Sequence, residues 1–237
     1  MNSRPQLSSA NISYKEALFK VRTLLKEGYE YKNIQAHSIS LLAEIFKCSK
    51  EIFYKDPERV LSVEERVLLC NLLGRLQNKE PLAYILSYQD FWTSRFFVNP
   101  DVLIPRPESE LLIEKALLFL KTYETKFHGN LKALDLACGS GCLGLSLLKE
   151  LSNLSCDFWD ICPKALAVTK KNSELLKIDQ KRLNILRKDI LDPKSWEKAC
   201  KYDILISNPP YISREEESEV GKEVFDLIKN KKMPKGD

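Results

Sequence analysis

The chain has 237 residues, of which 44% are hydrophobic and 30% are charged, and it carries a net charge of +4. This is the composition of an ordinary globular protein with room for one large domain or two modest ones, and the mild charge does not favour a nucleic-acid-binding surface. The chain has seven cysteines, none in a CxxC pair, and only two histidines, which argues against a metal site and a disulfide framework. No apolar run approaches the roughly 20 residues of a membrane span. We therefore expect a cytoplasmic location.

Residues 12–86 carry the apolar spacing of helices. The sequence "SYKE" at 13–16 fits a capping box at the start of the first helix. A second helix is predicted over about 33–47, and "SVEE" at 62–65 opens a third. The third helix carries the apolar residues Val67, Leu68, Leu72, Leu73 and Leu76. The pattern predicts a small helical domain over residues 1–87.

The stretch "FWTSRFFVNPDVLIP" is aromatic and β-branched, which is typical of strands. It predicts a β-hairpin with its turn at Thr93–Ser94, in a linker over residues 88–105. Pro107 suits the first turn of a helix that runs to about Tyr123. This helix opens the second predicted domain, residues 106–237.

From residue 131 onward, near-continuous apolar strands alternate with helices. The strands are predicted at 132–137, 155–161, 183–190 and 202–208, and the later helices at 163–177 and 194–200. Such alternation predicts an α/β fold with a parallel, doubly wound sheet.

A glycine pattern follows the first of these strands and opens a helix. Gly139, Gly141 and Gly144 match G-x-G-x-x-G, in which glycine lets the backbone turn sharply and approach a ligand. Asp160 ends the second strand, where a carboxylate can accept both hydroxyls of an adenosine ribose. Asp189 follows in "RKDIL" and could accept from an adenine amino group, with Ile190 against the ring. The glycine pattern fits either NAD or S-adenosylmethionine.

The fourth strand runs into Asn208, Pro209, Pro210 and Tyr211. Ligands of open α/β sheets bind beyond the carboxyl ends of the strands, so we expect Asn208 to lie at the ligand site. The Asn208 side-chain oxygen and the Pro209 carbonyl provide two acceptors for a planar –NH₂ group, and Tyr211 can stack on its flat face. Two acceptors aim a weakly nucleophilic nitrogen at a methyl donor, whereas hydride transfer has no use for them. This favours S-adenosylmethionine as the cofactor.

The sequences "DLACGSG", "FWDICPKAL", "RKDIL" and "SNPPYI" resemble, in this order, a class I (Rossmann-like) methyltransferase domain that methylates amino groups. Two sequences upstream, "EPLAYILSYQDFW" at 80–92 and "LIPRPESELL" at 103–112, closely resemble the HemK/PrmC family of release factor N5-glutamine methyltransferases. The resemblance implies methylation of the glutamine in the Gly-Gly-Gln loop of class I peptide chain release factors, the expected protein partners. It also implies that residues 1–87 dock the substrate.

The resemblance also assigns site residues in this chain. It implies substrate contact and catalysis at Asn208, Pro209 and Tyr211, with Pro210 in the same motif. It implies cofactor contacts at Ala137, Cys138, Gly139, Ser140, Gly141, Asp160 and Ile190. Asp189 and Asn208, placed by the strand ends, complete the predicted cofactor site. No metal ligand is expected.

Two features depart from the family pattern. The family usually has glycine at the position of Ala137, whose methyl group is expected to crowd the methionine end of the cofactor slightly; Cys138 is interpreted as a small filler. The sheet would need roughly 60–70 further residues after Tyr211, so we expect a C-terminally shortened domain without its last strands. Three alternatives stay open: N5-glutamine methylation of a ribosomal protein, adenine-N6 methylation of DNA, and a non-catalytic binding fragment.

Overall fold

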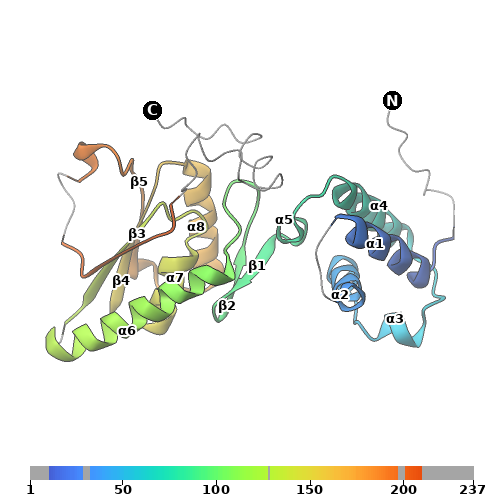
Figure 1. Cartoon of the computed structure of the whole chain (residues 1–237), viewed down its shortest axis with the longest axis horizontal. Helices are drawn as coiled ribbons and strands as arrows, with labels where there is room; N and C mark the ends of the chain where they lie inside the picture. The colour runs from blue at the N-terminus through green and yellow to red at the C-terminus, as the bar shows by residue number, and fades with distance from the viewer. Residues whose placement is uncertain (1–10, 29–32, 128, 197–200, 210–237) are drawn as a thin grey trace.

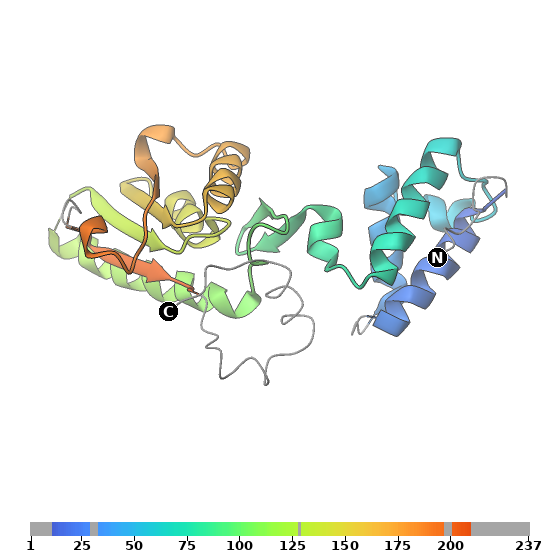
Figure 2. The ribbon, with the colours of Figure 1, turned by 90° about the horizontal axis from the view of Figure 1, so that it is seen from above.

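The computed structural model describes residues 11–28, 33–127, 129–196 and 201–209. A helical bundle and an α/β sheet lie at opposite ends of the chain, with one short helix and a hairpin between them (Figures 1 and 2). In the described ranges, no helix is long and apolar enough to cross a membrane.

The bundle contains four helices, α1 (Tyr14–Gly28), α2 (Ile34–Phe46), α3 (Ile52–Lys55) and α4 (Val63–Gln77). The predicted helix starts at 13–16 and 62–65 are confirmed, and both form capping boxes. Ser13 and Glu16 exchange backbone-to-side-chain hydrogen bonds of 2.9 and 3.3 Å, and Ser62 and Glu65 exchange bonds of 2.8 and 3.2 Å. These bonds satisfy N–H groups that the first helical turn leaves without partners.

The apolar residues of α4 do not all face the core. Val67 and Leu68 are 65% and 41% exposed, while Leu69 is fully buried. Leu69, with Leu72, Leu73 and Leu76, follows the i, i+3, i+4, i+7 spacing of one helical face, and the two exposed residues lie off that face.

The hairpin joins β1 (Tyr88–Phe91) and β2 (Ser94–Phe97) after the short helix α5 (Leu82–Leu86). Its turn is Trp92–Thr93, one residue earlier than predicted, because Phe91 pairs with Ser94. Trp92 has a positive φ of 53°. Its backbone N–H donates to Glu110 Oε1 at 2.8 Å, which fastens the turn to the helix that follows.

The α/β part contains η1 (Pro107–Ser109), α6 (Glu110–Phe127), β3 (Leu131–Leu136), α7 (Cys142–Glu150), β4 (Leu154–Asp160), α8 (Pro163–Leu175), η2 (Gln180–Arg182), β5 (Leu183–Arg187), η3 (Pro193–Ser195) and β6 (Ile204–Ser207). The four strands are parallel in the order β5-β4-β3-β6, as expected for the predicted fold class. The predicted third strand is too long, since β5 ends at Arg187. Of the predicted helix at 194–200, the described residues form the short η3, and 197–200 lie outside them.

Helices α6, α7 and α8 cover one face of the sheet, because each contacts its neighbour and successive strands. Gly144 of α7 lies so close to β4 that an added Cβ would be 2.5 Å from Phe158 and 2.9 Å from Cys156. Side chains alternate along a strand, so Asp157 and Trp159 point to the opposite face.

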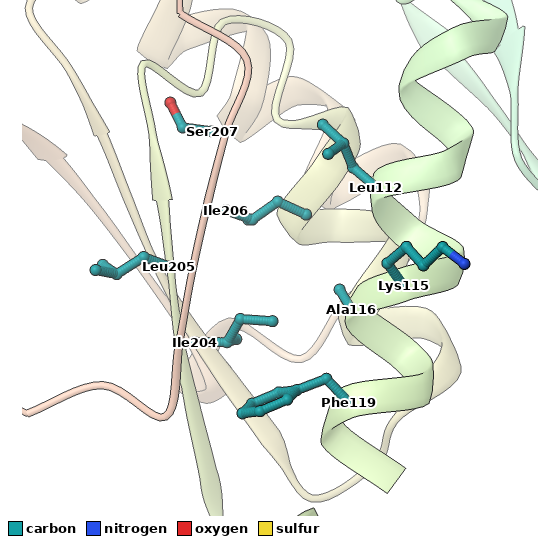
Figure 3. A pocket seen from close by; sticks show the side chains of 8 residues that line it. All are labelled: Leu112, Lys115, Ala116, Phe119, Ile204, Leu205, Ile206 and Ser207. Atoms are coloured by element: carbon teal, nitrogen blue, oxygen red, sulfur yellow. The ribbon is translucent and has the colours of Figure 1, made fainter. Parts of the chain in front are cut away.

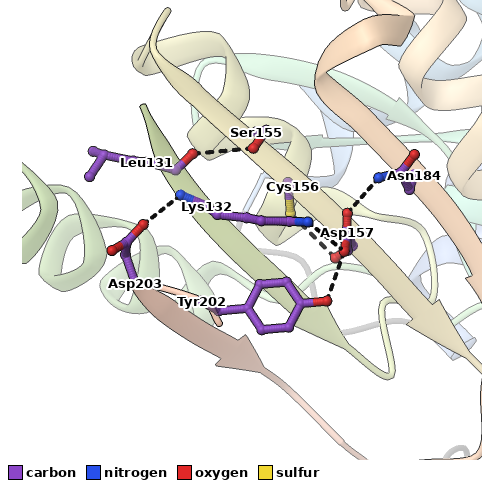
Figure 4. A network of polar contacts seen from close by, with 8 residues as sticks. All are labelled: Leu131, Lys132, Ser155, Cys156, Asp157, Asn184, Tyr202 and Asp203. Atoms are coloured by element: carbon purple, nitrogen blue, oxygen red, sulfur yellow. Dashed lines mark hydrogen bonds and ion pairs between the residues drawn. The ribbon is translucent and has the colours of Figure 1, made fainter. Parts of the chain in front are cut away.

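On this opposite face a polar network fastens β6 to its neighbours (Figure 4). Asp157 accepts from Tyr202 at 2.7 Å and from Asn184 at 2.8 Å, and it lies 3.3 Å from Lys132 Nζ. The Lys132 N–H donates to Asp203 Oδ2 at 2.8 Å. Because Tyr202 and Asp203 lead directly into β6, the network fixes the register of that strand.

A groove of about 320 Å³ lies between α6 and the outer edge of β6. Ile204 and Ile206 point into it, facing Leu112, Ala116 and Phe119 of α6, whereas Leu205 points away (Figure 3). The groove follows the strand edge, and only its Ser207 end approaches the carboxyl end of the sheet.

Candidate active site

The loop between β3 and α7 runs through three residues with positive φ. They are Ala137 (φ 53°), Gly139 (φ 55°) and Gly141 (φ 75°). Glycine adopts this region without strain, whereas alanine pays roughly 1 kcal/mol or more for it. The departure from the family pattern at Ala137 therefore falls on a position where the backbone itself favours glycine.

The two glycines have different surroundings. A Cβ added at Gly139 would have no heavy atom closer than 4.0 Å, so this part of the loop leaves room for a ligand. A Cβ at Gly141 would come within 2.7 Å of Thr169, so Gly141 serves the packing of α7 against α8. The open space at Gly139 fits the close approach of a cofactor to the backbone.

Asp160 ends β4 directly beside this loop. Its Oδ2 accepts from the Gly139 N–H at 2.9 Å, and its Oδ1 accepts from the Cys162 N–H at 2.9 Å. The carboxylate thus holds the glycine loop against the end of the strand. A carboxylate at this place fits the hydroxyls of an adenosine ribose, so the residues present fit S-adenosylmethionine.

Asp135 is a buried acid that the sequence reading did not assign. Its Oδ2 accepts from the Gly144 N–H at 2.9 Å, so it caps the start of α7 from beneath the loop. Burial raises the pKa of this carboxyl to about 7, and the nearby Asp160 charge adds to the increase. The signal was present in "DLACGSG", as an acid four residues before the first glycine.

Asn172 of α8 is the second residue that the sequence reading missed. Its Oδ1 accepts from the Phe97 N–H at 2.7 Å, and its Nδ2 donates to the carbonyl oxygens of Phe97 at 3.0 Å and Ser140 at 2.9 Å. One fully buried amide thereby joins the hairpin to the glycine loop.

Cys138 and Ser140 are both buried in the same loop. Cys138 Sγ lies 3.5 Å from Thr169 Oγ1, and burial raises the pKa of its thiol well above its usual value. A thiol held neutral is a poor nucleophile. This environment agrees with the interpretation of Cys138 as a filler.

Asp189 and Ile190 lie two and three residues beyond the end of β5. Asp189 Oδ1 accepts from the Leu191 N–H at 2.9 Å, and this local turn ends the strand earlier than the sequence predicted. The Ile190 carbonyl accepts from Trp196 Nε1 at 3.0 Å. Both residues are half-buried at the carboxyl end of the sheet, on the Asp160 side.

Asn208 follows β6, which pairs with β3. Its Nδ2 donates to Ser109 Oγ at 3.1 Å. Ser207 Oγ donates to the Leu136 carbonyl at 2.8 Å, which fixes the end of β6 beside the start of the glycine loop. Pro209 is described, whereas the predicted contributions of Pro210 and Tyr211 lie outside the described residues.

The arrangement can hold an adenosyl ligand along the ends of β3, β4 and β5, with an amide and a proline carbonyl at the end of β6. Ligands of open parallel sheets bind at this edge. The sheet register thus brings the glycine loop and Asn208 to one place, although 67 positions of sequence separate Gly141 from Asn208.

Two family models match the sequence. The PrmC N-terminal domain matches residues 16–86, and the Methyltransferase small domain matches residues 114–236.

Three curated relatives share the name release factor glutamine methyltransferase. The relative from Leptospira interrogans serogroup Icterohaemorrhagiae serovar Lai is 36% identical over 216 residues, covering 87% of this chain and 72% of that protein. The relative from Bacteroides thetaiotaomicron is 32% identical over 206 residues, covering 87% of this chain and 70% of that protein. The relative from Flavobacterium psychrophilum is 34% identical over 213 residues, covering 82% and 72%.

Proposed function

The chain belongs to the release factor glutamine methyltransferase family, and we propose that it methylates class I peptide chain release factors. The proposed reaction places one methyl group on the side-chain N5 nitrogen of the glutamine in the Gly-Gly-Gln motif. The observation that carries this proposal is the pairing of β6 with β3, which puts Asn208 beside the glycine loop.

S-adenosylmethionine, when bound, would supply a methyl group on a positively charged sulfur; the amide nitrogen would bond to the methyl carbon while the bond between that carbon and the sulfur breaks. The side chain of Asn208 and the carbonyl of Pro209 are proposed to accept hydrogen bonds from the two hydrogens of the glutamine –NH₂ group. An amide nitrogen is a poor nucleophile, because its lone pair is delocalised. Fixed acceptors aim it and raise its electron density, and positioning of this kind can supply several kcal/mol.

The other residues are proposed to hold the cofactor rather than to react. Gly139 leaves room along the loop, and Asp160 offers its carboxylate to the ribose hydroxyls. The half-buried Asp189 and Ile190 are proposed to contact the adenine. The nitrogen can lose its proton to water once it is methylated, so no strong base is needed.

The helical part, residues 1–87, is proposed to dock the release factor, and residues 88–105 to link it to the methyltransferase domain at 106–237. The names of the relatives favour a release factor over a ribosomal protein or DNA as substrate. This function implies a cytoplasmic protein without direct contact to nucleic acid.

The proposal is tested by incubating the chain with labelled S-adenosylmethionine and a class I release factor. We expect label in the release factor and none in a variant whose motif glutamine is replaced by alanine. Label in DNA or in a ribosomal protein instead would contradict the proposed substrate. Cofactor binding without any transfer would favour a non-catalytic binding role.

A further inference from the structure

The turn that follows β5 carries Asp189 and Ile190, and the reaction proposed above gives no task to the residue that closes it, Trp196. The indole ring of Trp196 lies against β4, with its centroid 5.0 Å from that of the Trp159 ring. Trp159 is 2% exposed, so its ring is held in place by the sheet. The ring of Trp196 is therefore anchored on one side, and its N–H faces the turn.

One peptide bond of this turn is held at both of its polar ends. The Ile190 carbonyl accepts from Trp196 Nε1 at 3.0 Å. The N–H of the same peptide, which belongs to Leu191, donates to Asp189 Oδ1 at 2.9 Å. A trans peptide is planar, and its C=O and N–H point in opposite directions. The indole that fixes the carbonyl therefore also fixes the direction from which the Asp189 carboxylate is bound.

The direction of both hydrogen bonds follows from the chemistry of the groups. An indole N–H and a peptide N–H can only donate, whereas a carbonyl and a carboxylate can only accept. A carboxylate can accept about four hydrogen bonds, so the Leu191 N–H does not exhaust Asp189. The turn thus presents an oriented carboxylate that can accept further hydrogen bonds at the carboxyl end of the sheet, where Asp189 is half-buried.

We propose that Trp196 is a positioning residue of the adenine site. Through the peptide between Ile190 and Leu191, it holds the Asp189 carboxylate where this group accepts a hydrogen bond from the adenine amino group. The inference rests on the proposed function for the identity of the cofactor. It goes beyond that function, because it makes recognition of the amino group depend on an indole N–H that acts through Asp189.

The test measures the binding of two ligands by calorimetry. One is S-adenosylhomocysteine, the product that remains after methyl transfer. The other is its analogue with purine in place of adenine, which lacks the amino group.

Two variants remove the indole N–H of Trp196. Trp196→Phe keeps an aromatic ring against Trp159. A second variant carries benzothienylalanine in place of Trp196, which keeps the two-ring shape and replaces the N–H by sulfur. The matched control is Trp92→Phe, which removes an indole N–H that donates to Glu150 Oε1 at 2.9 Å, in the hairpin instead of the turn after β5.

We expect both Trp196 variants to raise the Kd for S-adenosylhomocysteine about fivefold, which is the size of one hydrogen bond. The Kd for the purine analogue should change by less than about twofold, because this ligand lacks the group that Asp189 binds. The preference of the protein for the amino group should therefore fall about fivefold. Trp92→Phe should bind both ligands like the wild type.

A double substitution tests whether Trp196 acts through Asp189. Asp189→Ala removes the carboxylate that the turn orients. Adding Trp196→Phe to this variant should change the Kd for S-adenosylhomocysteine by less than about twofold. A further loss of about fivefold would overturn the inference, because the indole would then act on the ligand by another route.

The remaining outcomes separate this inference from the proposed function. Unchanged binding in the Trp196 variants, or equal losses for both ligands, would overturn the inference, since a general loosening of the turn weakens both ligands alike. A wild type that binds both ligands equally well would also overturn it. If the wild type binds neither ligand, the cofactor assignment fails and this inference fails with it. If the preference falls as expected but the wild type transfers no methyl group to a release factor, the proposed function fails and the role of Trp196 stands.

Discussion

Replacing Asn172 is expected to damage both the stability of the protein and its cofactor site. Asn172→Ala removes three hydrogen bonds, of 2.7, 3.0 and 2.9 Å, from a fully buried amide. It leaves the backbone groups of Phe97 and the Ser140 carbonyl without these partners. At about 1 to 2 kcal/mol for each lost bond, the free energy of unfolding should fall by about 3 to 5 kcal/mol. For a chain of this length, that lowers Tm by roughly 10 °C.

The cofactor site should weaken as well, because the Ser140 carbonyl belongs to the glycine loop. The Gly139 carbonyl still accepts from Thr169 Oγ1 at 2.9 Å, so the loop keeps its other attachments. We therefore expect the Kd for S-adenosylmethionine to rise about fivefold to tenfold, or roughly 1 kcal/mol. Asn172→Asp should be at least as harmful at pH 7, since it turns a carboxylate oxygen toward two carbonyl oxygens.

The assay is urea unfolding followed by tryptophan fluorescence, with calorimetry for cofactor binding. Asn184→Ala serves as the control, because Asn184 is exposed and its side chain makes one hydrogen bond within the described residues, to Asp157. It should cost about 1 kcal/mol or less. If Asn172→Ala unfolds within about 1 kcal/mol of the wild type and binds the cofactor equally well, the reasoning from these three bonds is refuted.

Three further changes test the loop and the acid beneath it. Ala137→Gly should relieve the strain of φ 53°, and this gain should exceed the cost of added flexibility, so the free energy of unfolding should rise by about 0.5 kcal/mol. Cofactor affinity should rise slightly, because the methyl group that crowds the methionine end is removed. A loss of stability above about 1 kcal/mol would count against this reasoning. Gly144→Ala should cost roughly 1 to 3 kcal/mol in urea unfolding, because its Cβ would meet Phe158 at 2.5 Å; a neutral result would contradict that packing. The pKa of Asp135 is about 7 in the folded state and 3.8 in the unfolded state. Between pH 3.8 and pH 7 the folded state therefore holds a proton that the unfolded state has lost. The contribution of Asp135 to the free energy of unfolding falls as pH rises through this range. Asp135→Asn should therefore gain roughly 2 to 3 kcal/mol on the wild type between pH 5 and pH 8, and an unchanged difference at the two pH values would refute the shift.

Features that depend on neighbouring residues could be predicted from the sequence. The capping boxes at Ser13 and Ser62 need only a serine and a glutamate three residues apart, and both form. The strands of the sheet carry their apolar pattern locally, and the pairing of β6 with β3 follows from the usual topology of such sheets. The predicted end of β5 is wrong by three residues, because the Asp189 side chain accepts from the Leu191 N–H and turns the chain after Arg187.

Features that depend on distant backbone atoms could not be predicted in this way. Asn172 looks like any polar residue of a helix, since its partners at Phe97 and Ser140 are backbone groups that carry no sequence signal. Ser109 and Asn208 each belong to a recognisable motif, but only the fold brings them to 3.1 Å from one another. The positive φ of Ala137 likewise depends on the path of the loop between β3 and α7.

The most direct test of the proposed function locates the transferred methyl group. A class I release factor is treated with S-adenosylmethionine and either the wild-type chain or Asn208→Ala, and the products are digested and sequenced by tandem mass spectrometry. We predict one methyl group on the side-chain nitrogen of the Gly-Gly-Gln glutamine with the wild type, and almost none with Asn208→Ala, whose cofactor binding should largely survive. A methyl group on another residue, or equal methylation by both proteins, would contradict the assignment of this site.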